Sequence, residues 1–73
     1  MDKTIYSQDH KKFVSKLKQA RIETGIDQKK AASLLGMTQS YISKVESGQR
    51  RVDVVQMKNF AKIYKKSLNY FIN

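Results

Sequence analysis

Apolar residues recur every three or four positions along most of this chain, which is the spacing of helices that bury one face. The first stretch carries Phe13, Leu17 and Ala20. The apolar positions of the later stretches are Ala31, Ala32, Leu35, Ile42, Val45, Val54, Met57, Phe60, Ala61 and Tyr64, followed by a short turn at 69–72. No stretch alternates strictly between apolar and polar residues, as a half-buried strand would. The pattern therefore predicts an all-α fold built from short helices.

Residues that begin and end helices flank these stretches. Side chains that can accept a hydrogen bond from the first turn of a helix stand at Asp9, Asp27, Thr38 and Asp53. Glycines that can end a helix in the left-handed conformation stand at Gly25, Gly36 and Gly48. These boundaries predict one helical domain over residues 9–73, preceded by a flexible N-terminal segment, 1–8.

The composition narrows the class of protein. A chain of 73 residues can form one compact core but not two, and it has no cysteine for a disulfide or a thiolate metal site. It shows neither a signal-peptide pattern nor an apolar run long enough to span a membrane, so we expect a cytoplasmic protein. The formal net charge of +9 favours a polyanionic partner, with nucleic acid as the first candidate. The same excess of charge could also be a solvated surface.

The segment 27–46, with the sequence DQKKAASLLGMTQSYISKVE, predicts a helix-turn-helix. Ala32 is small where two helices must cross closely, and Gly36 permits the positive φ of a tight turn between them. Thr38 then caps the second helix of the motif, which we expect to run from 39 to 47. This arrangement predicts two short helices at a steep angle.

One face of that second helix is short and polar. At about 100° per residue, one arc contains Gln39, Ser40, Ser43, Lys44 and Ser47, and the opposite side contains Ile42 and Val45. Glutamine can pair with the major-groove edge of adenine, serine with several bases, and lysine with guanine or a phosphate. Such a face suits entry into the major groove of DNA, although the same residues would also make an ordinary solvated surface.

Together these motifs resemble those of the bacterial Xre and Cro/C1-type helix-turn-helix family, which includes lambdoid phage repressors and the controller proteins of restriction-modification systems. The similar motifs are LKQAR at 17–21, IDQ at 26–28, the turn residues Ala32, Gly36 and Thr38, ISKVESG at 42–48 and LNYF at 68–71. The resemblance covers about residues 13–72, nearly the whole chain. It implies a compact, lambda-repressor-like domain of five helices, in which the second and third helices read DNA.

The resemblance also suggests roles for individual residues. It implies that base edges are read by Gln39, Ser40, Ser43 and Lys44. Contacts to DNA phosphates are expected from Gln28, Thr38, Tyr41, Ser47, Arg50 and Arg51. Arg21 and Glu46 match an internal ion pair of the family, which ties the first helix to the recognition helix. Tyr41 could instead cover the core, Arg50 and Arg51 could be mobile surface charges, and the ion pair could be exposed and of little consequence.

Two positions depart from the pattern of the family. Lys65 stands where the family commonly ends the fourth helix with glycine, and Val52 stands where it often has proline. A lysine with positive φ would cost about 1 kcal/mol relative to glycine. We expect the fold to tolerate Lys65 in this conformation, and the loop 49–52 to be less rigid than one that contains proline.

The favoured functional prediction is a transcriptional regulator that binds a palindromic operator in double-stranded DNA as a homodimer, with half-sites about one helical turn apart. The dimer contact is expected from the C-terminal helices, through some of Tyr64, Leu68, Tyr70 and Phe71. The alternative is an antitoxin or adaptor-like interaction module for which DNA is a secondary partner. General packaging of nucleic acid fits less well, because it needs charge without a defined reading face.

Catalysis and cofactor binding have little support in the residues. The six acids are scattered and no glycine-rich phosphate loop follows a strand, so we do not expect an enzyme. His10 is the one histidine and has no second ligand at helical spacing, so we expect neither a metal nor a cofactor. A core of this size also leaves little room for a small-molecule ligand.

Overall fold

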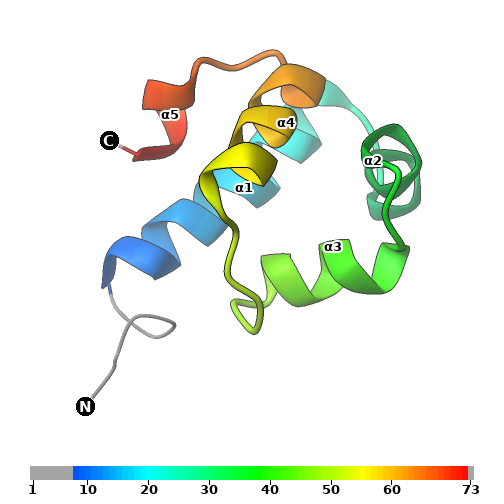
Figure 1. Ribbon diagram of the computed structural model, residues 1–73. Coiled ribbons are helices and arrows are strands. Elements are labelled where there is room, and N and C mark those ends of the chain that lie inside the picture. Colours follow the sequence, from blue (N-terminus) through cyan, green and yellow to red (C-terminus); the bar gives the residue numbers. More distant parts are fainter. Residues whose placement is uncertain (1–7, 73) are drawn as a thin grey trace.

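The computed structural model describes residues 8–72, which form five α-helices (Figure 1). Their bounds are α1 Gln8–Thr24, α2 Gln28–Leu35, α3 Gln39–Glu46, α4 Val54–Tyr64 and α5 Leu68–Ile72. No strand occurs within 8–72, so the all-α prediction is confirmed. The long helix α1 contacts α3, α4 and α5, and α2 packs most extensively on α3.

Side-chain caps begin three of the helices, as the sequence predicted. The carboxylates of Asp27 and Asp53 each accept a hydrogen bond of 2.8 Å from a backbone N–H three residues further along the chain. Thr38 Oγ1 accepts one of 3.1 Å in the same way. Each bond satisfies one of the N–H groups that the first turn of a helix leaves without a partner in the helix. The caps therefore fix where α2, α3 and α4 begin.

The first helix starts earlier than predicted. α1 already includes Gln8, so Asp9 lies within its first turn and is not the cap. A carboxylate in this position still interacts favourably with the positive end of the helix dipole, which explains why an acid is tolerated there. The flexible segment predicted for 1–8 lies, apart from Gln8, outside the described residues.

The turn between α2 and α3 sets the geometry of the helix-turn-helix. Gly36 has φ 68° and ψ 29°, and its N–H points to the carbonyl oxygens of Ala32 and Ser33. Ala31 and Ala32 are 0% and 3% exposed, so only methyl groups separate α2 from its neighbours there. Figure 1 shows α2 nearly end-on beside a lengthwise view of α3, and the two helices therefore cross steeply, as expected.

All five helices contribute to one core. Its most deeply buried large side chains are Leu17, Ile42, Val45, Phe60 and Tyr64, which all belong to the predicted apolar stripes. Val54 was also expected to face the core, but it is 60% exposed. It is the first residue of α4, and the side of this helix that packs on the core begins one turn later, at Met57.

The fourth helix ends at Lys65 in the left-handed conformation, with φ 57° and ψ 42°. Its N–H points to the carbonyl oxygens of Ala61 and Lys62, and the N–H of Lys66 donates to Ala61 at 3.0 Å. Within 8–72, Lys65 is the one residue other than glycine with positive φ. The predicted helix end is confirmed, and a lysine carries the backbone cost that glycine would avoid.

Candidate nucleic-acid interface

The outer side of α3 carries the residues predicted to read bases. Its exposed side chains are those of Gln39, Ser40, Ser43 and Lys44. On the opposite side, Ile42 and Val45 are 0% and 1% exposed. Burial of these two apolar residues fixes which face of the helix turns outward. The outward face therefore presents amide, hydroxyl and ammonium groups, which can donate to or accept from base edges.

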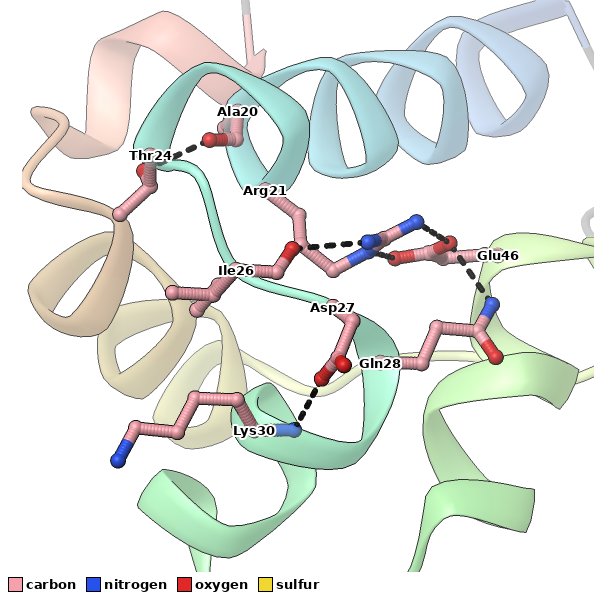
Figure 2. Close-up of polar contacts among 8 residues, drawn as sticks. All are labelled: Ala20, Arg21, Thr24, Ile26, Asp27, Gln28, Lys30 and Glu46. Carbon is pink, nitrogen blue, oxygen red and sulfur yellow. Dashed lines mark hydrogen bonds and ion pairs between the residues drawn. The ribbon is translucent and has the colours of Figure 1, made fainter.

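Arg21 of α1 and Glu46 of α3 form an ion pair where the two helices meet (Figure 2). Arg21 Nε donates to Glu46 Oε2 at 2.7 Å, and one terminal guanidinium nitrogen donates to Glu46 Oε1 at 3.2 Å. The other terminal nitrogen donates to the carbonyl oxygen of Ile26 at 2.9 Å. The side chains of Arg21 and Glu46 are only 12% and 6% exposed. One guanidinium thus joins α1, the α1–α2 connection and the end of α3.

Gln28 at the start of α2 belongs to the same network. Its Nε2 donates to Glu46 Oε1 at 3.1 Å, so the carboxylate accepts three hydrogen bonds from two side chains (Figure 2). The hydrogen bond with Glu46 raises the pKa of Arg21, because it stabilises the charged guanidinium. Two parallel bonds between planar groups allow little freedom of orientation. The network therefore holds α3 in a defined position relative to α1 and α2.

Several acidic groups of the described residues have roles inside the domain. Asp27 and Asp53 cap helices, and Glu23 and Glu46 are in ion pairs. These four carboxylates are therefore occupied within the fold. The excess of lysine and arginine remains on the outside, where it can attract a polyanion.

The residues expected to contact phosphates have varied surroundings. Thr38 and Ser47 are exposed at the two ends of α3, and the Ser47 hydroxyl donates to the carbonyl oxygen of Lys44 at 3.1 Å. A carboxamide nitrogen carries two N–H groups, so the bond from Gln28 to Glu46 leaves it a further donor. Contact of Ser47 with a phosphate as a donor would require its hydroxyl to rotate away from Lys44.

Tyr41 lies in the core and supports the loop that follows α3. It is 7% exposed, and its ring stacks on that of Phe60 with the centroids 6.5 Å apart. Burial raises the pKa of the Tyr41 hydroxyl. The Arg50 guanidinium lies 5.0 Å from the centre of the same ring, within the range of a cation–π contact, and Arg51 is exposed. The most direct influence of Tyr41 on a phosphate is therefore through the position of Arg50.

Two of the four residues among which the dimer contact was expected are buried in the core. Tyr64 and Phe71 are 1% and 2% exposed within a single chain. The ring of Tyr64 packs against Phe60 and that of Phe71 against Phe13, because a small domain needs its largest side chains to close its own core. Leu68 and Tyr70 are partly exposed, so they remain available to a second copy.

Some exposed apolar residues were not anticipated from the sequence. Among the described residues, the large apolar side chains on the surface are Ile22, Leu34, Val54 and Val55, each at least half exposed. A signal for two of them was present: adjacent residues on a helix point in different directions, so Val54 and Val55 cannot both face one core.

Within 8–72 no cluster of three potential metal ligands occurs, and none of the helices there is long and apolar enough to cross a bilayer.

The fold and the exposed polar face of α3 define a helix-turn-helix DNA-binding domain. A helix-turn-helix family model matches residues 17–71, and the chain belongs to this family of Xre and lambda-repressor-like proteins. The crystal structure of the restriction-modification controller protein C.AhdI from Aeromonas hydrophila is similar, with a TM-score of 0.80 and 32% sequence identity. The match covers 86% of this chain and 91% of that one. No curated protein sequence matches.

These comparisons confirm the predicted five-helix, lambda-repressor-like fold. They also identify the protein as a DNA-binding regulator of transcription, a class that is typically not enzymatic.

Proposed function

We propose that this protein is a sequence-specific transcriptional regulator that acts in the cytoplasm and binds a palindromic operator in duplex DNA as a homodimer. The observation that carries the proposal is the exposed polar face of α3, which the network of Arg21, Gln28 and Glu46 holds in position. The similarity to a restriction-modification controller protein supports a regulatory role.

The dimensions of α3 suit the major groove. Its eight residues, Gln39–Glu46, rise about 12 Å along the helix axis, and the groove is about 12 Å wide. In this proposal Gln39 and Ser40 lie at the amino end, where a recognition helix approaches base edges, and Ser43 and Lys44 follow one turn later. The two ends of the helix then lie close to the sugar-phosphate walls of the groove.

Phosphate contacts in this proposal surround the reading face. Gln28 and Thr38 approach the backbone from the start of α2 and from the cap of α3, and Ser47 does so from the end of α3. Arg50 and Arg51 lie in the loop that follows, where they neutralise further phosphates. Such contacts set the register of the protein on the duplex, whereas the bases set its sequence preference.

Selection of bound sequences from a pool of random duplexes tests this function. We expect enrichment of a palindrome whose half-sites are centred about one helical turn apart. Binding that is strongly salt-dependent but selects no sequence would contradict a regulator that reads bases. Absence of binding to any duplex would favour the interaction-module alternative.

The dimer surface can be located with two apolar-to-acidic substitutions. Leu68→Glu introduces a charge on α5 and should turn the dimer into a monomer in sedimentation equilibrium, with weaker binding to the full palindrome. Val55→Glu is the matched control, because Val55 is 69% exposed and lies at the start of α4. Circular dichroism checks that both variants are folded. Loss of the dimer in Val55→Glu alone would place the interface on α4.

A further inference from the structure

A small pocket lies between the amino-terminal half of α1 and the end of α3. Its volume is 270 Å³, and its lining residues are His10, Lys11, Val14, Ser15, Glu46, Ser47 and Gly48. The pocket closes where His10 Nε2 comes within 3.4 Å of the carbonyl oxygen of Gly48, which can only accept a hydrogen bond. The first turns of α1 are thereby placed beside the turn that follows the recognition helix.

The polar groups of this pocket suit an anion. Lys11 provides an ammonium group and Ser15 a hydroxyl group, which can both donate hydrogen bonds. The Ser47 hydroxyl donates to the carbonyl oxygen of Lys44 at 3.1 Å, so it becomes a donor to a ligand once it rotates away from that oxygen. Lys11 and Ser15 are both exposed and stand four residues apart on α1, so they lie on the same face of the helix. This combination of one cation and two hydroxyls is typical of residues that contact a phosphate.

The negative charge of Glu46, which also lines the pocket, does not prevent an anion from binding there. Both of its carboxylate oxygens accept hydrogen bonds from the Arg21 guanidinium, and one of them also accepts a bond from Gln28. The Glu46 side chain is 6% exposed, and its charge is compensated by Arg21 at 2.7 Å. The unshared charge at the mouth of the pocket is therefore that of Lys11.

The position of the pocket favours the DNA backbone as the source of such an anion. α3 ends at Glu46, one residue before the predicted end, and Ser47 is its C-cap residue. Ser47 also lines the pocket, so the pocket lies at the carboxyl end of the helix that carries the polar face. A helix about as long as the groove is wide brings its ends close to the phosphates on either side. A duplex that receives α3 thus brings its backbone toward the pocket.

We propose that this pocket is a phosphate-contact site, in which Lys11 and Ser15 of α1 together with Ser47 hold one phosphodiester of the DNA backbone beside the end of α3. The proposal rests on the proposed function and extends it. It makes α1 part of the DNA-binding surface.

The test compares Lys11→Gln with Lys12→Gln. Both residues are exposed neighbours on α1 and both substitutions remove one positive charge, but only Lys11 lines the pocket. Titration of a duplex at several salt concentrations gives the slope of log affinity against log salt. Lys11→Gln should reduce the magnitude of this slope by about 0.9 for each protomer bound, the value for one phosphate, and Lys12→Gln should leave it close to that of the wild type. Equal slopes in the two variants would overturn the proposal.

A second measurement identifies the phosphate. Duplexes in which one phosphate at a time is replaced by a neutral methylphosphonate should include a position at which the wild type loses affinity and Lys11→Gln does not. If no position distinguishes the two proteins, the assignment of Lys11 is wrong. Nuclear magnetic resonance with inorganic phosphate in place of DNA separates the two sources of the anion: saturable shifts of the Ser47 and Gly48 amides at millimolar phosphate would contradict a site for the DNA backbone.

These outcomes can be told apart from failure of the proposed function. If the wild type selects a palindrome but the two lysine variants have equal salt slopes, the proposed phosphate site is wrong and the proposed regulatory function is retained. If the wild type binds no duplex, both proposals are wrong.

Discussion

Two charged residues near the end of α1, only two positions apart, make ion pairs of different kinds. Arg21 Nε lies 2.7 Å from Oε2 of Glu46 at the end of α3. Glu23 Oε1 lies 2.8 Å from Nζ of Lys66, in the connection between α4 and α5. The side chains of the first pair are 12% and 6% exposed, whereas those of Glu23 and Lys66 are 44% and 27% exposed. The distances are nearly equal, so burial is what separates the two pairs.

The difference shows which contact determines the position of α3. Arg21 also donates to the carbonyl oxygen of Ile26, and Glu46 also accepts from Gln28, so loss of either ion leaves partly buried polar groups without partners. Glu23 loses only a solvated contact, because water can replace Lys66. Stability and DNA reading should therefore depend on the first pair much more than on the second.

The largest effect on stability is expected when only one residue of the Arg21–Glu46 pair is replaced. Arg21→Met or Glu46→Leu should each lower the free energy of unfolding by about 3 kcal/mol, because the remaining ion stays partly buried without its partner. The double variant should be less destabilised than either single one, since apolar side chains of similar volume can pack there. Urea denaturation of the wild type, the two single variants and the double variant measures the coupling free energy between Arg21 and Glu46.

Additive effects of a few tenths of a kcal/mol in that cycle would mean that the pair has no tying role. The double variant also separates stability from function. It should remain folded and yet bind its preferred duplex more weakly, because the network that orients α3 is gone.

A moderate effect is expected next to the exposed pair, at Lys65. Its φ of 57° is unfavourable for a lysine, so Lys65→Gly should raise the free energy of unfolding by roughly 0.5 to 1 kcal/mol, reduced in part by the greater freedom of glycine in the unfolded chain. DNA preference should not change, since Lys65 is at the far end of α4 from the loop that follows α3. A lower urea midpoint would show that the lysine side chain stabilises this turn more than its backbone conformation costs.

The smallest effect is expected from the exposed pair itself. Glu23→Gln should change the urea midpoint by an amount close to the limit of detection. Hydrogen bonds from Gln19 and then Lys66 lower the pKa of Glu23 below its ordinary value of 4.5. The unfolded chain therefore takes up this proton first as the pH falls, so the contribution of Glu23 is present above about pH 4.5 and is lost below it.

Urea titrations of the wild type and Glu23→Gln across acidic pH check the sign of that dependence. The two curves should converge as Glu23 of the wild type becomes protonated. Divergence toward low pH would mean that the carboxylate destabilises the fold.

Most of the fold could be predicted because the relevant signals are local. The caps at Asp27, Thr38 and Asp53 need only a few consecutive residues, and Gly36 is required by one turn. The incorrect prediction that Asp9 caps the first helix also concerns a local signal, since helix ends fray and their bounds shift easily. The prediction for Val54 was wrong for another reason. An apolar residue in the first turn of a helix fits a stripe in projection, but in α4 the side that packs on the core begins one turn later, at Met57.

The parts of the site that joined distant segments were harder to predict. Arg21 and Glu46 were paired only through the family resemblance, and nothing in composition or spacing connects Glu23 with Lys66, 43 residues away. The pocket beside Ser47 depends on where α1 passes the end of α3, which is a property of the tertiary packing. The burial of Phe71 likewise depends on how a small core is completed.

The contrast between the two ion pairs matters for function because the buried one positions α3 to read bases. Gln39 is the residue that tests this most directly. It follows the cap Thr38, is exposed, and stands at the amino end of the helix that we propose to enter the major groove. Since it contributes nothing to the core, Gln39→Ala should leave folding unchanged.

The decisive measurement is a titration of wild type and Gln39→Ala against the selected operator and each of its single-base variants. The substitution should cost about 1 to 3 kcal/mol on the preferred site and abolish the preference at one base position. The salt slope and the affinity for random duplex should stay nearly the same, because no phosphate contact is lost. If Gln39→Ala retains the wild-type preference at every position, Gln39 does not read a base, and the assignment of the α3 face to base reading is contradicted at its first residue.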